Sequence, residues 1–374
     1  MAVTIENEPE DWQTSDNPII YQFSSDMSGE ANFSFKIELK INAVVVFTDK
    51  IFVEVNGNAH FDAAAVTKFL VAGPTTLAPL ESDSGTSRTI QLVVTENYGS
   101  PPVDEASAST SVTKTFKGGV SDKEYLELQY GDYELTRWLT DHPTNDIDIL
   151  RLEDKYISML STGAPVTAEL NFYDASDVLQ HTYTTPVRTY DVWQFNLTDG
   201  NLILTAGVPN LSIITYFTVQ VDSSEIMTLR YYDDQCVPAV SVNWVNKYGA
   251  FDSFVFKHAN VESGTVDADN YAKQFGGWDA DSYTFQLSAS GTLDYYKRTN
   301  NKGRAVTDYL EENIQNWLTS IYKGLSHQMV LVDGTTYPIR VTTTNFQLQQ
   351  RRFIDLRTIV IDYSVSYFDN SLTL

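Results

Sequence analysis

The clearest pattern in this chain is an alternation of apolar and polar residues near its N-terminus. Between residues 32 and 41, Phe33, Phe35, Ile37, Leu39 and Ile41 are separated by mainly polar residues. An extended chain places every second side chain on the same face, so this period predicts a β-strand with one buried face. Similar reasoning predicts strands at 51–55, 89–95 and 109–116, a short helix at 61–71 opened by Asp62, and a surface loop through 99–102 and 107–111. Residues 1–118 are therefore expected to form a β-sandwich-like domain with one inserted helix.

The middle third of the chain continues the strand pattern. Gly118 and Gly119 are candidates for a hinge, and the segment 125–139 shows no clean single period. Apolar runs at 168–173 and 178–183 flank a turn at 174–177, which predicts a hairpin. Two further strands are predicted at 192–197 and 213–221. A second β-sandwich-like domain over residues 119–235 accounts for these elements.

The last third contains the longest helical pattern of the chain. Apolar residues recur at spacings of three and four, which places them along one helix face; they are Val306, Tyr309, Leu310, Ile314, Trp317, Leu318, Ile321, Tyr322 and Leu325. Thr307 and Asp308 are N-cap candidates, Glu311 completes a capping box with Asp308, and Gly324 is the expected stop. Strands follow at 329–332, 337–343, 347–353 and 357–367, with a turn at Asp333 and Gly334.

These patterns together predict the fold class. The protein is expected to be mainly β, with two β-sandwich (Ig-like) domains at 1–118 and 119–235. A C-terminal α+β domain at 236–374 would carry one long helix packed on a sheet.

Charge and composition narrow the possible partners. The chain has 49 Asp and Glu against 25 Lys and Arg, a formal net charge of −24, which repels phosphate backbones and argues against sequence-specific nucleic-acid binding. No run of about 18 apolar residues occurs, and residues 1–16 are acidic where a secretory signal is basic and then apolar. We expect no membrane insertion and synthesis in a cytoplasm. The single cysteine, Cys236, is expected to be a small buried side chain.

No motif that carries chemistry stands out. The five histidines, at positions 60, 142, 181, 258 and 327, lie far apart, and no phosphate loop, nucleophile elbow or kinase signature is present. The acidic residues Asp233, Asp234, Asp267, Asp269, Asp279 and Asp281 do not follow a calcium-loop spacing. The sequence therefore predicts no catalytic, cofactor-binding or metal-binding residues, no cofactor and no enzymatic activity.

One group of aromatic residues allows a different hypothesis. Gly276, Gly277 and Trp278 lie near Tyr271, Tyr283, Tyr295 and Tyr296. Exposed rings could stack on the apolar face of a sugar, whereas the alternative is sheet packing or a subunit contact.

Three segments of the chain resemble a known group of proteins. Residues 242–256 run from an apolar strand ending at Asn246 through Gly249 to Phe251, Asp252 and alternating aromatic residues. The C-terminal helix with Asp333, Gly334 and Pro338, and the opening at 17–23, follow the same pattern. In these segments the chain resembles structural proteins of tailed phages that infect Bacteroidota, including crAss-like phages.

The resemblance implies a virion location and no catalytic residues. It points to a structural protein of the tail, baseplate or neck that assembles into a ring with copies of itself and contacts other tail or neck proteins. An acidic lumen in such a ring would let DNA pass without adhesion. The alternative function is a receptor- or glycan-binding module displayed on a phage particle or cell surface.

Overall fold

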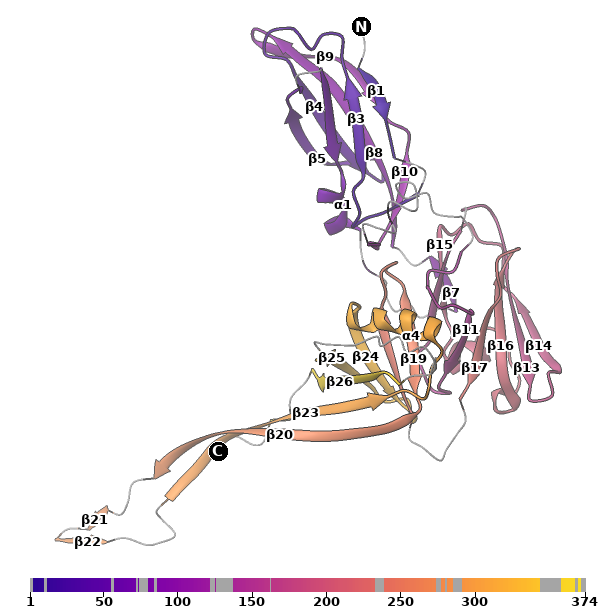
Figure 1. The fold of residues 1–374 in the computed structure, drawn as a ribbon, viewed down its shortest axis with the longest axis vertical. Coiled ribbons are helices and arrows are strands. Elements are labelled where there is room, and N and C mark those ends of the chain that lie inside the picture. The colour runs from indigo at the N-terminus through magenta and orange to yellow at the C-terminus, as the bar shows by residue number, and fades with distance from the viewer. Residues whose placement is uncertain are drawn as a thin grey trace. The chain divides into compact units, whose positions relative to one another are not determined.

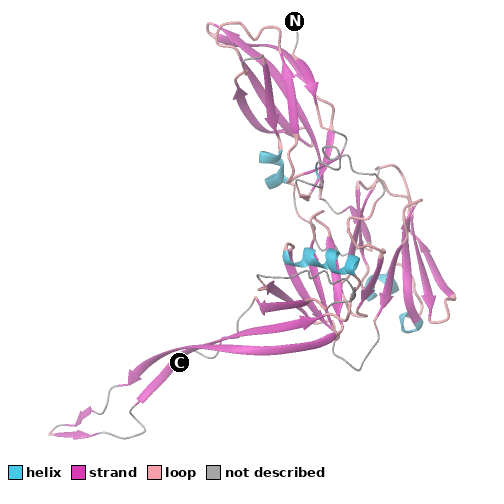
Figure 2. Ribbon diagram, viewed as in Figure 1, coloured by secondary structure: helices cyan, strands magenta, loops and turns pink. Residues whose placement is uncertain are grey.

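The computed structural model forms two compact units. Unit 1 comprises Met1–Tyr231 and Val245–Ser253, and unit 2 comprises Tyr232–Trp244 and Phe254–Leu374. The described residues are 3–9, 12–54, 57–71, 73, 80–83, 86–121, 125, 137–161, 163–232, 239–273, 277–279, 281–284, 291–343, 358–366 and 369–370. Strands dominate these residues, and the few helices are short (Figures 1 and 2). The expectation of a mainly β protein is confirmed.

Two sheets enclose the first core of unit 1. One has the order β1-β3-β6, from β1 (Thr4–Asn7), β3 (Ile20–Ser24) and β6 (Asn58–Asp62). The other has the order β2-β10-β8-β4-β5 with β9 paired to β8, from β2 (Trp12–Thr14), β4 (Ser34–Ile41), β5 (Val44–Ile51), β8 (Ser87–Gly99), β9 (Pro102–Ser109) and β10 (Thr113–Phe116). Alternate residues of β4 are buried between the sheets because one face of that strand is apolar throughout.

In the N-terminal part, the strand predicted from the strong alternation is confirmed, whereas two neighbouring predictions are wrong. The strand at 32–41 is confirmed as β4, but β5 ends at Ile51 where a strand at 51–55 was expected. Asn42 and Ala43 both adopt positive φ and form a two-residue hairpin turn, for which alanine is an unusual residue. The loop expected at 107–111 is also wrong in part, since β9 runs to Ser109 beside β8.

The predicted helix at 61–71 is shorter than expected. The helix α1 spans Ala64–Leu70, and Phe61 and Asp62 still belong to β6. Asp62 nevertheless lies at the helix start as anticipated, because its Oδ1 accepts hydrogen bonds from the backbone N–H groups of Ala64 and Ile19.

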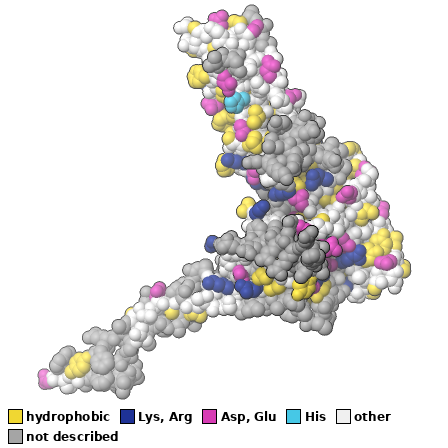
Figure 3. All heavy atoms as spheres, viewed as in Figure 1, with side chains coloured by type: hydrophobic (Ala, Val, Ile, Leu, Met, Phe, Trp, Pro, Cys, Tyr) yellow, Lys and Arg dark blue, Asp and Glu magenta, His cyan; other side chains and the backbone are white. Residues whose placement is uncertain are grey.

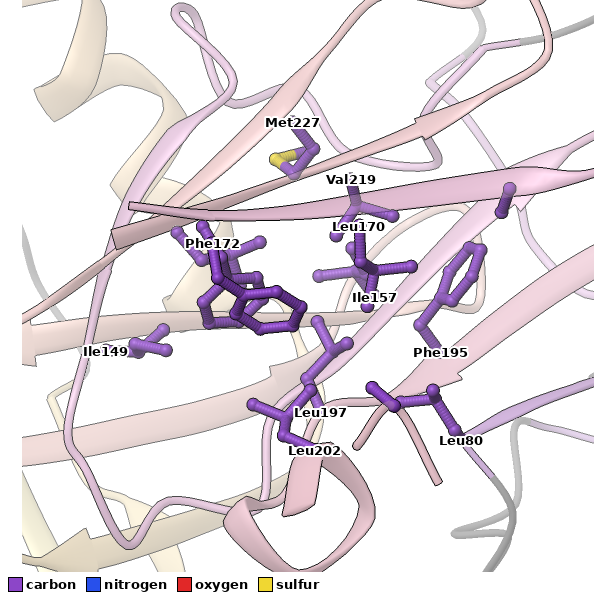
Figure 4. Close-up of a cluster of buried hydrophobic side chains, with 14 of the residues drawn as sticks. Leu80, Ile149, Ile157, Leu170, Phe172, Phe195, Leu197, Leu202, Val219 and Met227 are labelled. Atoms are coloured by element: carbon purple, nitrogen blue, oxygen red, sulfur yellow. The ribbon is translucent and has the colours of Figure 1, made fainter. Parts of the chain in front are cut away.

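The second core of unit 1 lies between two further sheets. The five-stranded sheet has the order β11-β17-β16-β13-β14, from β11 (Asp146–Ile149), β13 (Ala168–Asp174), β14 (Leu179–Thr184), β16 (Ile214–Val221) and β17 (Met227–Tyr231). The three-stranded sheet has the order β12-β15-β7, from β7 (Glu81–Asp83), β12 (Tyr156–Leu160) and β15 (Val192–Asn196). Figure 4 shows side chains from both sheets meeting in this core, with Leu80 beside Phe195. The predicted hairpin is confirmed as β13 and β14, and the predicted strands at 192–197 and 213–221 as β15 and β16.

Helices are minor in this part of the chain. The helix α3 (Asp199–Leu204) is capped by Thr198, whose side chain accepts a hydrogen bond from the Asn201 N–H group, and η1 (Leu211–Ile213) is a single 3-10 turn. The strand β7 precedes residue 118 in sequence but pairs with β15 at the edge of the second core. The domain boundaries at 118 and 235 stay predictions.

Unit 2 is built on one sheet of eight strands. Its order is β19-β18-β24-β25-β26-β23-β20, with β27 paired to β23. The strands are β18 (Val240–Val245), β19 (Phe251–Phe256), β20 (His258–Lys273), β23 (Gly291–Val306), β24 (Leu325–Leu331), β25 (Thr336–Val341), β26 (Val360–Val365) and β27 (Asp369–Asn370). The β24–β25 hairpin confirms the strand, turn and strand predicted around Asp333 and Gly334, and β26 lies within the predicted strand at 357–367.

The long helix predicted for this region is wrong in length. The helix α4 covers only Glu312–Leu318 and continues as the 3-10 turn η3 (Thr319–Tyr322). Val306 ends β23 instead, opposite Val360, and the N-cap is Glu311, not Thr307 or Asp308. The packing itself is confirmed, because Trp317, Leu318 and Ile321 contribute to the buried core formed with the sheet.

Two strands that the sequence analysis missed form the longest strand pair among the described residues. β20 and β23 each span 16 residues and pair from His258 opposite Val306 to Lys273 opposite Gly291. β26 pairs with β23 only at Lys302–Val306, so the two strands continue past their sheet as a ribbon (Figure 1). We call residues 268–273 of β20 and 291–297 of β23 the arm. A small hairpin follows between them, from β21 (Gly277–Asp279) and β22 (Ser282–Thr284).

Some predictions fall on residues outside the described part of the chain. These are the strand at 347–353, most of the segment 125–139, and the residues Asp233, Asp234, Cys236 and Gly276. Within the described residues, every helix is too short or too polar to cross a membrane.

The second core offers a direct test of its packing. Leu170 is fully buried there, so we expect Leu170→Ala to lower the free energy of unfolding by about 2–5 kcal/mol, through lost contacts and the cavity left behind. Leu179→Ala is the matched control, because Leu179 is 51% exposed on the neighbouring strand. Urea unfolding followed by tryptophan fluorescence measures both. Equal losses in the two variants would contradict this assignment of the core.

Candidate functional site

A polar region with many hydrogen bonds surrounds a hairpin tip in unit 1. The chain turns at residues 246–250, between β18 and β19. The Asn246 side chain holds this turn, since its Oδ1 accepts hydrogen bonds from the N–H groups of Tyr248 (2.9 Å) and Ala250 (3.2 Å). Its Nδ2 donates to the carbonyl oxygen of Leu139 at 2.8 Å. One asparagine therefore shapes the tip and attaches it to a distant segment.

Glycine permits a backbone-to-backbone contact at this tip. The Gly119 N–H group donates to the Lys247 carbonyl oxygen at 2.7 Å. A Cβ at Gly118 would lie 2.7 Å from that same oxygen, and a Cβ at Gly249 would overlap the Lys117 carbonyl group. Gly118 and Gly119 were predicted as a hinge; in the structure they form a tightly packed contact with the hairpin tip.

Tyr248 joins the tip to a charged cluster. Its hydroxyl donates to Asp141 Oδ1 at 2.7 Å, and Lys247 Nζ lies 2.5 Å from Asp141 Oδ2. The Arg137 guanidinium lies over the Tyr248 ring, 5.1 Å from its centroid. Burial, together with the Asp141 carboxylate, raises the pKa of Tyr248, so its phenol stays neutral and serves as a donor.

An apolar cluster surrounds the Tyr248 ring. Side chains from the end of the first core, from the second core region and from the hairpin tip meet in it: Trp12, Phe116, Val120, Tyr125, Leu139, Leu160, Val192, Tyr248 and Ala250. The tip is therefore held by apolar burial as well as by hydrogen bonds. We call this cluster and its polar neighbours the junction.

Buried charges lie at the other side of the hairpin tip. Lys155 is 1% exposed, Glu153 is 2% exposed and Asp252 is 3% exposed. Lys155 Nζ donates to Ser253 Oγ. Burial lowers the pKa of Lys155, while the carboxylates of Glu153 and Asp252 act in the opposite direction and favour its charged form. Removal of the Lys155 charge, or of the carboxylate charges, would leave the opposite charge buried without compensation.

An open polar hollow lies beside the junction. Its volume is about 560 Å³, and its lining residues are Arg137, Trp138, Thr140, Asp141, His142, Pro143, Asn145, Ser223, Ser224 and Glu225. Its polar groups bind one another: Trp138 Nε1 donates to the Glu225 carbonyl oxygen (2.7 Å), and Asn145 Nδ2 donates to Glu225 Oε2 (2.9 Å). The hollow is therefore braced by internal hydrogen bonds.

The chemistry of the junction is that of a rigid connection. Lys155 would be the candidate nucleophile, but its side chain is enclosed and hydrogen-bonded. The described part of the chain holds no group of three or more His, Cys, Asp or Glu side chains arranged for a metal ion. His181 and His327 bond backbone carbonyl oxygens, and His60 lies beside Glu54, so each of these histidines has a different partner.

The aromatic residues considered for sugar binding lie along the arm and the hairpin that follows it. Trp278 lies opposite Tyr283 in the β21–β22 pair, and Tyr271 lies opposite Leu293. Tyr271 is 47% exposed and Tyr283 is 48% exposed. Asp267 and Asp269, whose spacing does not match a calcium loop, belong to β20. The sequence analysis missed the junction because its members carry no chemical motif; only the tight Asn246 to Gly249 turn signalled it.

Comparisons with known proteins do not assign this chain to a family. No protein-family model matches the sequence, and no curated protein matches it. Among solved structures, the class 5 fimbriae chaperone CfaA is similar over 62% of this chain and 100% of its own length, with 8% sequence identity and a TM-score of 0.20. A TM-score of this size carries no argument about fold or function.

A pair of glycine variants tests the backbone contact. Gly249 and Gly207 both have positive φ (66° and 70°), but a Cβ at Gly207 meets nothing within 4 Å. We expect Gly207→Ala to cost about 1–2 kcal/mol for the left-handed conformation alone. Gly249→Ala should cost about 1–3 kcal/mol more, because it also forces the two segments apart. Equal free energies of unfolding for the two variants would show that the contact is loose.

His142 makes the stability of unit 1 depend on pH. Burial and the Lys155 charge lower the pKa of His142 from 6.5 to about 4, so between these values only the unfolded state takes up the proton. Stability contributed by neutral His142 is fully present above pH 6.5 and is lost as pH falls to about 4, a loss of about 3 kcal/mol. Between pH 7.5 and 4, the free energy of unfolding of His142→Gln should therefore fall by about 3 kcal/mol less than that of the unchanged protein. His60→Gln, at an exposed position, should follow the unchanged protein; a His142→Gln curve parallel to both would refute the assignment.

Proposed function

We propose that this chain is a non-enzymatic structural protein of a tailed-phage particle. It would form a ring in the tail, baseplate or neck through contacts with copies of itself and with other tail or neck proteins. Its place would be the virion, after synthesis in the host cytoplasm. The resemblance at residues 242–256 supports the location. That segment also contains the hairpin tip that the junction holds in place.

The observation that carries the assembly part of this proposal is an uncovered apolar strand edge. β5 is the last strand of its sheet and pairs only with β4 among the described residues. Val44, Val45 and Val46 are 64%, 45% and 40% exposed there. Proteins protect such edges with charges or bulges, or they use them to bind another chain. Charged residues appear in β5 only at Asp49 and Lys50, and the register with β4 shifts at Val46. The edge therefore has an irregularity but little charge beside its exposed valines, which offer apolar surface for a protein contact.

The sheets support a finer description of the fold. We infer that the two enclosed cores of unit 1 correspond to two β-sandwich (Ig-like) domains, and that the sheet with α4 corresponds to an α+β C-terminal domain. Sandwiches in series, held by a rigid junction, suit a subunit that must keep its contact surfaces at fixed positions in a ring.

A second candidate function is receptor or glycan binding. The exposure of Tyr271 and Tyr283 favours it, since two phenol rings offer stacking surface at or near the end of the arm. Binding of host polysaccharide by the purified monomer, lost in a Tyr271→Ala and Tyr283→Ala double variant, would support this function over the structural one.

Purified particles of the phage that encodes the chain test the structural proposal. We expect the polypeptide among the particle proteins by mass spectrometry, and electron microscopy should place it in a ring with several copies. Its absence from washed, intact particles would overturn the proposal.

The role of the β5 edge can be measured separately. The double variant Val44→Lys and Val46→Lys places charges on the apolar edge, so we expect it to lower self-association or incorporation into particles at least tenfold. Val112→Lys is the control, because Val112 is 53% exposed outside any strand. Sedimentation velocity of the purified proteins gives the comparison.

A further inference from the structure

The strand β14 is an exposed edge of the five-stranded sheet in unit 1. It is the last strand in the order of that sheet and pairs only with β13 among the described residues. The opposite edge of the sheet, β11, carries Asp146 and Asp148, whereas β14 contains no Asp, Glu, Lys or Arg. Sheets commonly protect their edges with charged side chains. The edge at β14 lacks the protection that the edge at β11 has.

The backbone of β14 directs hydrogen-bonding groups toward solvent. The Thr185 N–H group donates to the Ala168 carbonyl oxygen of β13 at 2.9 Å. Opposite residues of an antiparallel pair alternate between bonded and non-bonded pairs, so Thr182 and Thr184 direct their N–H and C=O groups away from β13. Both threonines are exposed, and the register with β13 shifts only near the turn, between Leu179 and His181. Residues 181–185 are therefore a regular edge that another strand can join.

Apolar side chains lie at both ends of this edge. Val178 and Leu179 are 52% and 51% exposed at the end next to the turn. At the other end Val187 is 62% exposed, just before Arg188 forms a bridge to Val166 that continues the hairpin. Figure 3 shows hydrophobic side chains grouped at the right of the view, over the β13–β14 hairpin labelled in Figure 1. The edge thus combines open backbone groups with exposed apolar surface.

We propose that β14 pairs with β14 of a second copy of this chain. The two strands are antiparallel about a two-fold axis at Tyr183, so Thr182 of each chain lies opposite Thr184 of the other. The two sheets then form one continuous sheet. This inference goes beyond the proposed function, because a two-fold contact closes with two chains and needs no ring.

The hydrogen-bonding pattern selects the position of the axis. With Tyr183 at the centre, both Thr182–Thr184 pairs are bonded pairs, and each pair exchanges two N–H···O bonds. Tyr183 then faces Tyr183 of the other copy in a non-bonded pair, where side chains approach closely and aromatic residues stabilise a sheet. An axis at Thr182 would use Gln180, where the strand is irregular, in two of its three bonded pairs.

The same axis brings the exposed apolar ends of the two edges together. Tyr183 lies opposite Leu170 of β13, and Leu179 lies opposite Tyr173, on the turn side of that point. Val187 lies between the partners of Ala168 and Val166, at a similar distance on the other side. Leu179 of one chain is therefore level with Val187 of the other, at both ends of the contact. Each exposed side chain covers the other, which removes apolar surface from water.

Charge explains why the second strand comes from a copy of the same chain. A two-fold contact sets a strand against itself, so any charge near its centre would face a like charge and destabilise the pair. The chain has a formal net charge of −24, which makes most of its surface unfavourable for such a contact. β14 carries no charge. The nearest charges, Asp177 and Arg188, have opposite signs and are brought toward each other by the same axis.

Charge substitution gives the first test. Thr182→Lys with Thr184→Lys sets lysine opposite lysine at two places, and we expect sedimentation velocity to show a dimer dissociation constant raised about tenfold or more. Thr182→Glu with Thr184→Glu should have the same effect, and a mixture of the two proteins should dimerise again. Thr336→Lys, at an exposed strand position in unit 2, is the control and should dimerise like the unchanged protein. A Val44→Lys and Val46→Lys background keeps the β5 edge from contributing.

Single cysteines give the second test. In a Cys236→Ser background, a Thr182→Cys protein mixed with a Thr184→Cys protein should form a disulfide-linked dimer on oxidation, because opposite residues in a bonded pair have Cα atoms about 5.5 Å apart. Either protein alone should stay unlinked. Identical residues are then diagonal neighbours, with Cα atoms about 7–8 Å apart, beyond the usual disulfide range.

Three results would each overturn the β14 pair. These are an unchanged protein that is monomeric at every concentration measured, Lys and Glu variants that dimerise as the unchanged protein does, and linkage of the Thr182→Cys protein with itself. A strand of a different protein as the natural occupant would give the first of these results. The presence of the chain in purified particles is decided separately: its absence there would overturn the proposed function and leave the two-fold pair standing.

Discussion

The contact between the backbone at 117–119 and the hairpin tip at 247–249 is the constraint on which unit 1 depends. Two glycines permit it, because a side chain at Gly118 or Gly249 would collide with the facing segment. Once the backbones touch, Tyr248 reaches Asp141 and the tip joins a shared apolar cluster. The glycines therefore allow the close approach of the two backbones, and the side-chain interactions depend on that approach.

The buried charges around Lys155 add specificity to this arrangement. A lysine that is 1% exposed must have its charge compensated, and Glu153 and Asp252 provide carboxylates on both sides in sequence. A well-packed apolar group of similar volume can be as stable as a buried ion pair, but its contacts are not directional. We consider the ionic cluster a device that selects one docking position of residues 251–253 over others.

The sequence predicted those parts of the fold in which one local pattern dominates. The alternation of Phe35, Ile37 and Leu39 identified β4, and the Asp174 to Asp177 turn identified a hairpin. The errors arose where a local pattern had two interpretations: Val306 fits a helical spacing but pairs with Val360 in the sheet. The junction could not be predicted, since burial of a lysine and a tyrosine hydroxyl depends on segments more than 90 residues apart.

The position of β7 has a consequence for the order in which the chain can fold. Leu80 is fully buried in the second core, and Glu81–Asp83 form the edge beside β15, although both precede the whole of β8, β9 and β10 in sequence. During synthesis, residues 80–83 leave the ribosome long before Trp193 and Phe195 exist. The second core can therefore form only after the strand at 192–196 has been synthesised, although residues 80–83 are available much earlier. A fragment that begins at residue 119 would lack Leu80, which is part of that core.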